Sequence, residues 1–146
     1  NEYKKYVFEN FVKEKIEREL SELGLKVDFS EMPNGNGFYV YRESWYKDNN
    51  GFRIYFGDEN KNHCGRKWVG IEADNKRIEK KVLESLKGDS PTEWWPFGTQ
   101  WIEDEMDRWD WPSFTKNMVN GRFANYVISK VKAILKELEE KDISLD

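Results

Sequence analysis

Asp58, Glu59 and Lys61 follow an aromatic segment and have side chains that could together support metal-dependent hydrolysis. In that chemistry, two carboxylates hold a Mg²⁺ ion, and a lysine steadies the attacking water or the charge that develops. Other acids of the chain would have to complete the metal site. The candidates are Asp28 or Glu43, with Glu9 or Glu17 as a further acid. This interpretation predicts a nuclease that uses Asp28, Glu59 and Lys61, with Mg²⁺ as its cofactor.

His63 and Cys64 are residue types that bind metals or act in catalysis, but each occurs once in the chain. A zinc site needs about four ligands, so these two types alone cannot assemble one. A catalytic pair would need the two side chains to meet, and neighbouring residues of a strand point to opposite faces. Because Cys64 has no partner for an internal disulfide, the sequence favours a reducing compartment, and we expect a cytoplasmic protein.

Five of the seven tryptophans lie in one short segment, between Ser90 and Phe114. Such a density indicates either an aromatic groove or a set of buried rings that holds the segment to the sheet. Acidic residues between the rings would repel phosphate, so a cationic or protein partner fits better than stacked bases. The five candidate binding residues are Trp94, Trp95, Trp101, Trp109 and Trp111.

Composition limits the classes of partner. The chain has 146 residues, 16% of them aromatic, and a formal net charge of −4, which fits one folded domain. A nucleic-acid binder usually has a basic excess, so nucleic acid is not favoured as a partner. A local basic strip could come from Lys61, Arg66 and Lys67, or from Lys76, Arg77, Lys80 and Lys81. No apolar run is long enough to cross a membrane, so we expect no membrane association.

Apolar periodicity predicts three helices. The first runs from about Tyr3 to Leu23 and ends at Gly24, because glycine accepts the left-handed conformation of a helix end. The second runs from about Asn75 to Lys87. The last runs from about Lys116 to Lys141, and Gly121 marks a bend or a late start in it. The first stripe is Phe8, Val12, Ile16 and Leu20, with Phe11 and Leu23 beside it. The last stripe is Val119, Phe123, Val127, Val131, Ile134 and Leu138.

Between the first two helices, aromatic and β-branched residues predict an antiparallel meander. The expected strands are Leu25–Met32, Phe38–Tyr46, Phe52–Phe56 and Trp68–Ala73, with a hairpin at residues 48–51. We therefore predict a single α+β domain over residues 1–146, with about four antiparallel strands, helices on one face and an irregular tryptophan-rich connection. Tyr39, Tyr41, Trp45 and Tyr55 would line the sheet.

Parts of the chain resemble the C-terminal region of phage and bacterial proteins grouped with the PD-(D/E)XK nuclease superfamily. The matching pieces are Trp68–Ile71, Glu93–Pro96, Trp109 and the segment from Phe123 onward, and coverage runs from about Phe38 to Glu140. The resemblance implies a strand pair before a helix, then a Trp-Trp-Pro segment and a long last helix. It also implies that the metal-binding motif lies upstream. No catalytic residue is therefore carried over. The nuclease interpretation also lacks the usual Pro-Asp pair on the strand adjacent to Glu59.

The resemblance implies that this chain is an accessory module without the nuclease domain. Such a module would need no cofactor and would bind a protein partner or a parent nuclease domain. Our first hypothesis is accordingly a non-catalytic binding or sensing module of a DNA-processing or phage-defence protein. Two alternatives stay open. One is the compact Mg²⁺-dependent nuclease described above. The other is an acidic phage or mobile-element inhibitor that acts by binding a host protein.

Overall fold

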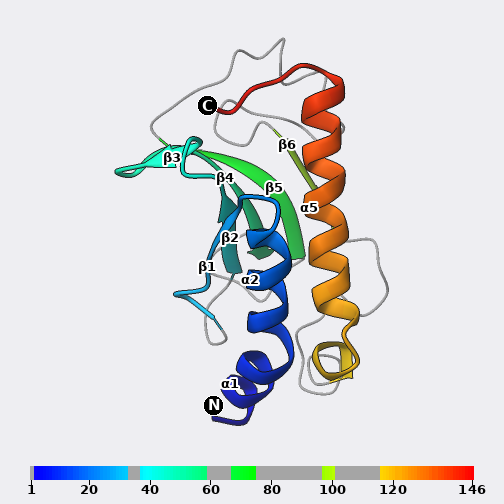
Figure 1. Ribbon diagram of the computed structural model, residues 1–146. Helices are drawn as coiled ribbons and strands as arrows, with labels where there is room; N and C mark the ends of the chain where they lie inside the picture. Colours follow the sequence, from blue (N-terminus) through cyan, green and yellow to red (C-terminus); the bar gives the residue numbers. More distant parts are fainter. Residues whose placement is uncertain (1, 33–36, 59–66, 75–96, 101–115) are drawn as a thin grey trace.

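The computed structural model describes residues 2–32, 37–58, 67–74, 97–100 and 116–146, and shows an α+β fold (Figure 1). The expected class, with N-terminal and C-terminal helices on an antiparallel sheet, is confirmed. The helical segments are α1 (Glu2–Phe8), η1 (Glu9–Lys13), α2 (Glu14–Ser21) and α5 (Arg122–Glu140). The strands are β1 (Lys26–Asp28), β2 (Gly37–Tyr41), β3 (Tyr46–Lys47), β4 (Asn50–Asp58), β5 (Lys67–Asp74) and β6 (Phe97–Gln100).

The first helix forms where the apolar spacing predicts it, and the four residues of its stripe are buried. The prediction that Phe11 lies beside this buried stripe is wrong, because Phe11 is 40% exposed. The π-helical turn η1 explains the difference. A π turn holds more residues than an α turn, so a residue three positions after Phe8 turns further from the buried face. The helix ends at Gly24, whose φ of +75° is the left-handed conformation expected there.

Two of the predicted strands are shorter in the structure. The first ends at Asp28 rather than Met32, because Asp28 Oδ1 accepts a hydrogen bond from the Ser30 backbone N–H and turns the chain. The second ends at Tyr41 and is followed by a turn in which the Trp45 N–H donates to the Arg42 carbonyl. That turn carries the Trp45 side chain into the core.

The hairpin predicted at residues 48–51 is present and joins β3 to β4. Asp48 and Asn49 both have positive φ, 52° and 62°, which is the backbone of a two-residue type I′ turn. Gly51 follows with a φ of +131°, and a Cβ there would lie 1.8 Å from the Trp45 carbonyl oxygen. Only glycine fits this close approach.

The six strands form one sheet in the order β1-β2-β4-β5-β6, and β3 pairs with β4 beyond the end of β2. Strand β6 corrects the expectation that the tryptophan-rich connection lacks regular structure. Residues 97–100 pair antiparallel with β5, which satisfies main-chain groups along that edge of the sheet.

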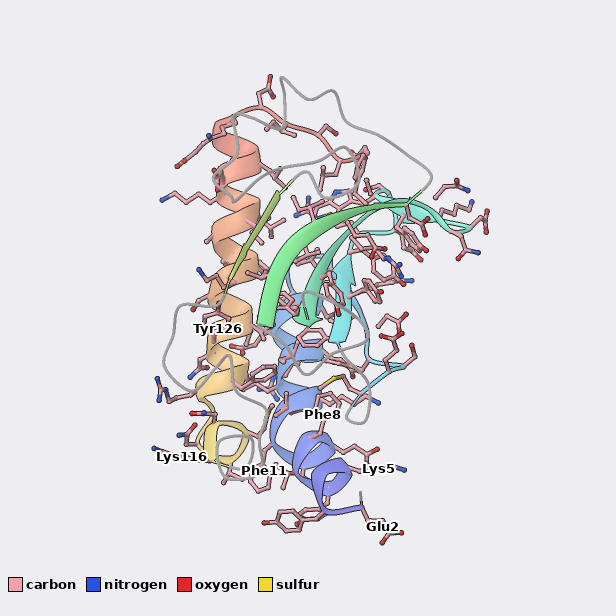
Figure 2. All side chains as sticks on the ribbon, turned by 180° about the vertical axis from the view of Figure 1, so that it is seen from behind. Glu2, Lys5, Phe8, Phe11, Lys116 and Tyr126 are labelled. Atoms are coloured by element: carbon pink, nitrogen blue, oxygen red, sulfur yellow. The ribbon has the colours of Figure 1, made fainter. Side chains whose placement is uncertain are left out.

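The core lies between one face of the sheet and the helices, as Figures 1 and 2 show from opposite sides. On this inner face, Phe38 and Phe56 are cross-strand partners whose rings stack at 5.1 Å. Phe38 also contacts Phe29 and Phe123, so aromatic rings connect the sheet to α5. The opposite face of the sheet, which we call the outer face, carries the alternate residues of each strand.

Helix α5 begins after Gly121, whose φ is +82°, so the glycine marks a late start. Its stripe from Phe123 to Leu138 is buried as predicted. Val119 is an error in that stripe, since it is 46% exposed. The left-handed conformation of Gly121 separates the helical turn at residues 116–119 from α5, so residues of that turn do not continue the buried stripe of α5. Met118 is buried at this point instead.

Candidate functional site at the outer face of the sheet

The outer face brings together polar and aromatic side chains in rows that cross the strands. Asp28, Tyr39 and Tyr55 lie opposite one another on β1, β2 and β4, and Gly70 of β5 continues the row. The Tyr39 and Tyr55 rings lie 5.2 Å apart, and Tyr55 is only 1% exposed. Their burial on the face away from the helices shows that this side of the sheet is also packed.

Arg53 is the centre of this arrangement. Its guanidinium carbon lies 3.8 Å from the centre of the Tyr39 ring and 4.1 Å from the centre of the Tyr46 ring. Arg53 Nη2 also donates to Oε1 of Glu72, its cross-strand partner, at 3.0 Å. The two side chains are 13% and 14% exposed. Cation–π contacts of this kind contribute about 0.5–2 kcal/mol each, and more as water is excluded.

We use the name Arg53 cluster for Tyr39, Tyr46, Arg53, Tyr55, Glu72 and Asp74. Its three contacts to Arg53 hold the guanidinium plane in one orientation, and the plane in turn fixes the two rings. The Nε of Arg53 is buried and has no hydrogen-bond partner among the described residues. Leaving a buried donor unsatisfied costs about 1–3 kcal/mol. The cluster therefore fixes side-chain positions at some cost in stability.

The Tyr46 hydroxyl lies at the edge of the cluster, 3.3 Å from Asp74 Oδ2 and 3.4 Å from Asn49 Oδ1. Burial raises the pKa of Tyr46 above its ordinary value of 10.0, and the nearby carboxylates of Asp74 and Glu72 raise it further. Arg53 acts in the opposite direction and lowers it. Because the phenol stays protonated at neutral pH, Tyr46 presents a hydrogen-bond donor rather than a base.

A groove of about 720 Å³ lies beside Tyr46. We call it the Tyr41 groove, and it is lined by Lys26, Tyr41, Glu43, Ser44, Tyr46, Lys47, Asp48 and Asn49. The Tyr41 and Tyr46 rings meet edge to face at 5.6 Å and form its aromatic wall. Lys26 and Glu43 form an ion pair at its rim, which raises the pKa of Lys26 and lowers that of Glu43 through their hydrogen bond.

The groove follows the open edge of β3. Neighbouring residues of a strand point to opposite faces of the sheet. Because Tyr46 and Lys47 both line the groove, the groove meets the edge of β3 rather than one of its faces. Among the described strands, β3 pairs only with β4. In this hairpin Lys47 pairs with Asn50, whereas Tyr46 lies opposite Gly51 in a non-hydrogen-bonded position, so the main-chain N–H and C=O of Tyr46 point away from β4 toward the open edge.

Of the four sheet residues predicted to bind a ligand, the structure brings three together. Tyr39 and Tyr55 are buried in the Arg53 cluster, and Tyr41 is half-buried in the wall of the groove. Trp45 lies apart from them. It is 5% exposed and belongs to the main core, because the turn at Arg42 reverses the alternation that would have placed it on the outer face.

The acids considered for a metal site lie in separate places. Asp28 is on the outer face in the row of Tyr39, and its carboxylate is used in the turn to Ser30. Glu43 is paired with Lys26. Glu9 and Glu17 belong to the helices on the other side of the sheet. Within the described ranges, no three His, Cys, Asp or Glu side chains are grouped closely enough to hold a metal ion.

Several predicted site residues lie outside the described residues. They are Glu59, Lys61, His63, Cys64, Trp94, Trp95, Trp101, Trp109 and Trp111. The same holds for the predicted second helix and for the candidate basic residues apart from the backbone of Lys67 in β5.

Sequence reasoning missed Arg53, Tyr46 and Glu72. Alternation along residues 52–56 does place Arg53 on the same face as Tyr55. The signal that could have found the cluster is the opposite charge of Arg53 and Glu72 on consecutive predicted strands. Arg53 and Glu72 pair only in one register of β4 against β5. Because 8 residues separate the two strands, the sequence does not determine that register.

None of the helices in the described part of the chain is both long and apolar enough to span a bilayer. The chain matches no known family model, no curated protein and no solved structure.

Proposed function

We propose that this chain is a binding module without a reaction of its own, and that it recognises an extended segment of a protein partner in the Tyr41 groove. One observation supports this most strongly. Arg53, held between Tyr39 and Tyr46 and paired with Glu72, fixes the aromatic wall beside an open strand edge. A preformed surface of this kind costs little ordering entropy when a ligand binds.

The chemistry of the groove suits a polypeptide. An extended segment can pair with the main-chain groups of Tyr46, which no described strand uses, and the tyrosine rings can contact its side chains. Lys26 and Glu43 neutralise each other, which leaves Lys47 and Asp48 as the groove's other charges, one of each sign. That balance favours a peptide of mixed charge over a nucleic-acid backbone, because phosphates require a basic excess.

The resemblance in sequence extends this proposal to the setting of the module. A domain associated with nucleases of the PD-(D/E)XK superfamily would bind a protein of DNA processing or phage defence. The acidic-inhibitor hypothesis remains compatible with the same groove, since it also requires a protein partner.

Selection from a random peptide library tests the proposal. We expect selected peptides to bind the wild-type chain and to lose at least about tenfold in affinity to Tyr41→Ala, as for loss of a buried aromatic contact. Tyr41→Phe should retain most of the binding, because the ring is kept. Tyr6→Ala is the matched control, since Tyr6 is an exposed tyrosine on α1. Equal affinity for wild type and Tyr41→Ala would contradict the proposal.

The absence of a reaction is tested separately. The purified chain is expected to leave plasmid DNA intact in the presence of Mg²⁺. Hydrolysis that is lost in Glu59→Gln and Lys61→Met would instead establish the nuclease hypothesis.

A further inference from the structure

A second pocket, of about 290 Å³, is lined by residues of the β2–β3 turn other than those that line the Tyr41 groove. The turn, the last turns of α5 and the C-terminal residues 143–146 form its walls, and it is open to solvent. Its wall consists of Arg42, Trp45, Leu135, Leu138, Glu139, Ile143, Ser144, Leu145 and Asp146. We call it the Arg42 pocket.

The apolar part of the pocket is firmly built. Trp45, Leu138 and Leu145 are each at least nine-tenths buried, and all three belong to the main core. The C-terminal segment is held in place because the Ile143 N–H donates to the Leu138 carbonyl at 2.9 Å. An engineered apolar cavity of about 150 Å³ binds benzene, so a pocket of this volume has room for a ligand of one or two rings.

Arg42 brings a positive charge to this apolar wall. Its guanidinium lies 5.4 Å from the centre of the Trp45 ring, and its Nη2 donates to the Leu23 carbonyl at a long 3.5 Å. The side chain is half-buried. No carboxylate lies within ion-pair distance of it in the described part of the chain. The guanidinium has five N–H donors, and within the described part of the chain the Leu23 carbonyl occupies one of them.

We propose that the Arg42 pocket binds a small apolar carboxylate, with Arg42 receiving the carboxylate and the Trp45–Leu138–Leu145 wall receiving the hydrocarbon. A planar guanidinium matches a carboxylate with two parallel hydrogen bonds. The ligand supplies the counter-ion that Arg42 does not have among the described residues, and it fills the apolar space. This site is independent of the Tyr41 groove.

Two acidic residues at the pocket act against an anion. Glu139 and Asp146 are both exposed, and neither lies within 4 Å of the Arg42 guanidinium. Because both residues are exposed, the repulsion from their charges is weakened by the solvent and by salt, whereas the half-buried arginine is less screened. The removal of one acid is therefore a direct test of the charge assignment.

The experiment uses 2-naphthoate as the probe and 2-naphthalenemethanol, which has the same ring system without the charge, as its control. Calorimetric titration measures each affinity, and NMR follows the Trp45 indole N–H. We expect the wild-type chain to bind the carboxylate about tenfold more tightly than the alcohol, as for a charge-assisted hydrogen bond. Arg42→Gln should remove that preference while the alcohol binds as before. Glu139→Gln should bind the carboxylate more tightly.

Three outcomes would overturn the proposal: equal affinity of the wild-type chain for the two probes, a preference that persists in Arg42→Gln, or no binding of naphthoate at millimolar concentration. If Arg42→Gln does not fold, Glu139→Gln decides the question, since that exposed position tolerates substitution. Unchanged or weaker carboxylate binding in Glu139→Gln would then contradict the assignment.

Discussion

The guanidinium of Arg53 lies 3.8 Å above the ring of Tyr39, on the face of the sheet that the helices do not cover. Tyr46 lies on the other side of the same guanidinium, and Glu72 neutralises it from the neighbouring strand. A charged side chain has thereby become part of the packing of a sheet. The relationship links the four strands β2, β3, β4 and β5, and it sets the geometry of the groove next to it.

The first prediction concerns the Arg53–Glu72 pair. Arg53→Gln should lower the free energy of unfolding by about 2–4 kcal/mol, because it removes the cation–π contacts and leaves Glu72 without its partner. A double-mutant cycle with Glu72→Gln should give a coupling of about 1–2 kcal/mol in urea denaturation. The exposed pair of Arg18 and Glu14 is the control and should show about 0.3–0.5 kcal/mol. Equal coupling in the two pairs would contradict the role of burial.

The second prediction concerns the glycine beside the hairpin. Gly51→Ala should destabilise the fold by about 3 kcal/mol or more, because the new Cβ would collide with the Trp45 carbonyl oxygen at a backbone conformation that alanine rarely adopts. Gly24 also has a positive φ, +75° against +131° at Gly51, but has open space around it, so Gly24→Ala should cost only about 1 kcal/mol. Thermal and urea unfolding of the two variants checks the difference. Similar losses at both positions would show that the contact with Trp45 is unimportant.

The third prediction tests the π turn of the first helix. Phe8→Ala should lower the free energy of unfolding by about 3–5 kcal/mol, since Phe8 is buried and its ring packs edge to face on Phe29. Phe11→Ala should change it by less than about 1 kcal/mol, because Phe11 is substantially exposed. If Phe11→Ala proved as costly as Phe8→Ala, Phe11 would belong to the core as the plain helical periodicity predicts.

The fourth prediction concerns the titration of Tyr46. Its ¹³Cζ resonance should titrate above pH 10.0, because burial and the nearby Asp74 and Glu72 carboxylates favour the neutral phenol. Asp74→Asn should bring the pKa of Tyr46 down, and Arg53→Gln should move it up. A value at or below 10.0 in the wild-type chain would contradict the environment described for this ring.

The same shift has a consequence for stability in alkali. The folded state holds the Tyr46 proton more tightly than the unfolded chain does, so the contribution of this group is fully present below pH 10.0. It is lost as the pH rises from there through the folded-state pKa. Tyr46→Phe should therefore show a flatter decline in the free energy of unfolding across that range than the wild type.

Much of the fold follows from local sequence signals. The step of four from Phe8 to Leu20 gave the first helix, and Asp48–Asn49 gave the hairpin, because the turn type demands positive φ at both positions. Gly24 and Gly121 marked the end of one helix and the start of another. These features depend only on residues close in the sequence.

The errors arose where distant groups or a local hydrogen bond decide the outcome. Trp45 was expected on the sheet surface, but the turn from Arg42 sends it to the core. Strand β6 forms because the edge of β5 accepts it, which the composition of residues 97–100 does not reveal. The Arg53 cluster depends on the register of the four strands β2, β3, β4 and β5, and a shift of one residue in a strand would place its side chains on the other face.

The most direct test of the proposed binding function is amide hydrogen exchange at β3, measured by NMR with and without a peptide selected on the wild-type chain. If the segment adds to the open strand edge, exchange of the Tyr46 main-chain amide should slow on binding, and chemical-shift changes should centre on Tyr41, Tyr46 and Lys47. A tightly bound peptide that leaves exchange at β3 unchanged, and shifts resonances away from the Tyr41 groove, would contradict the proposal.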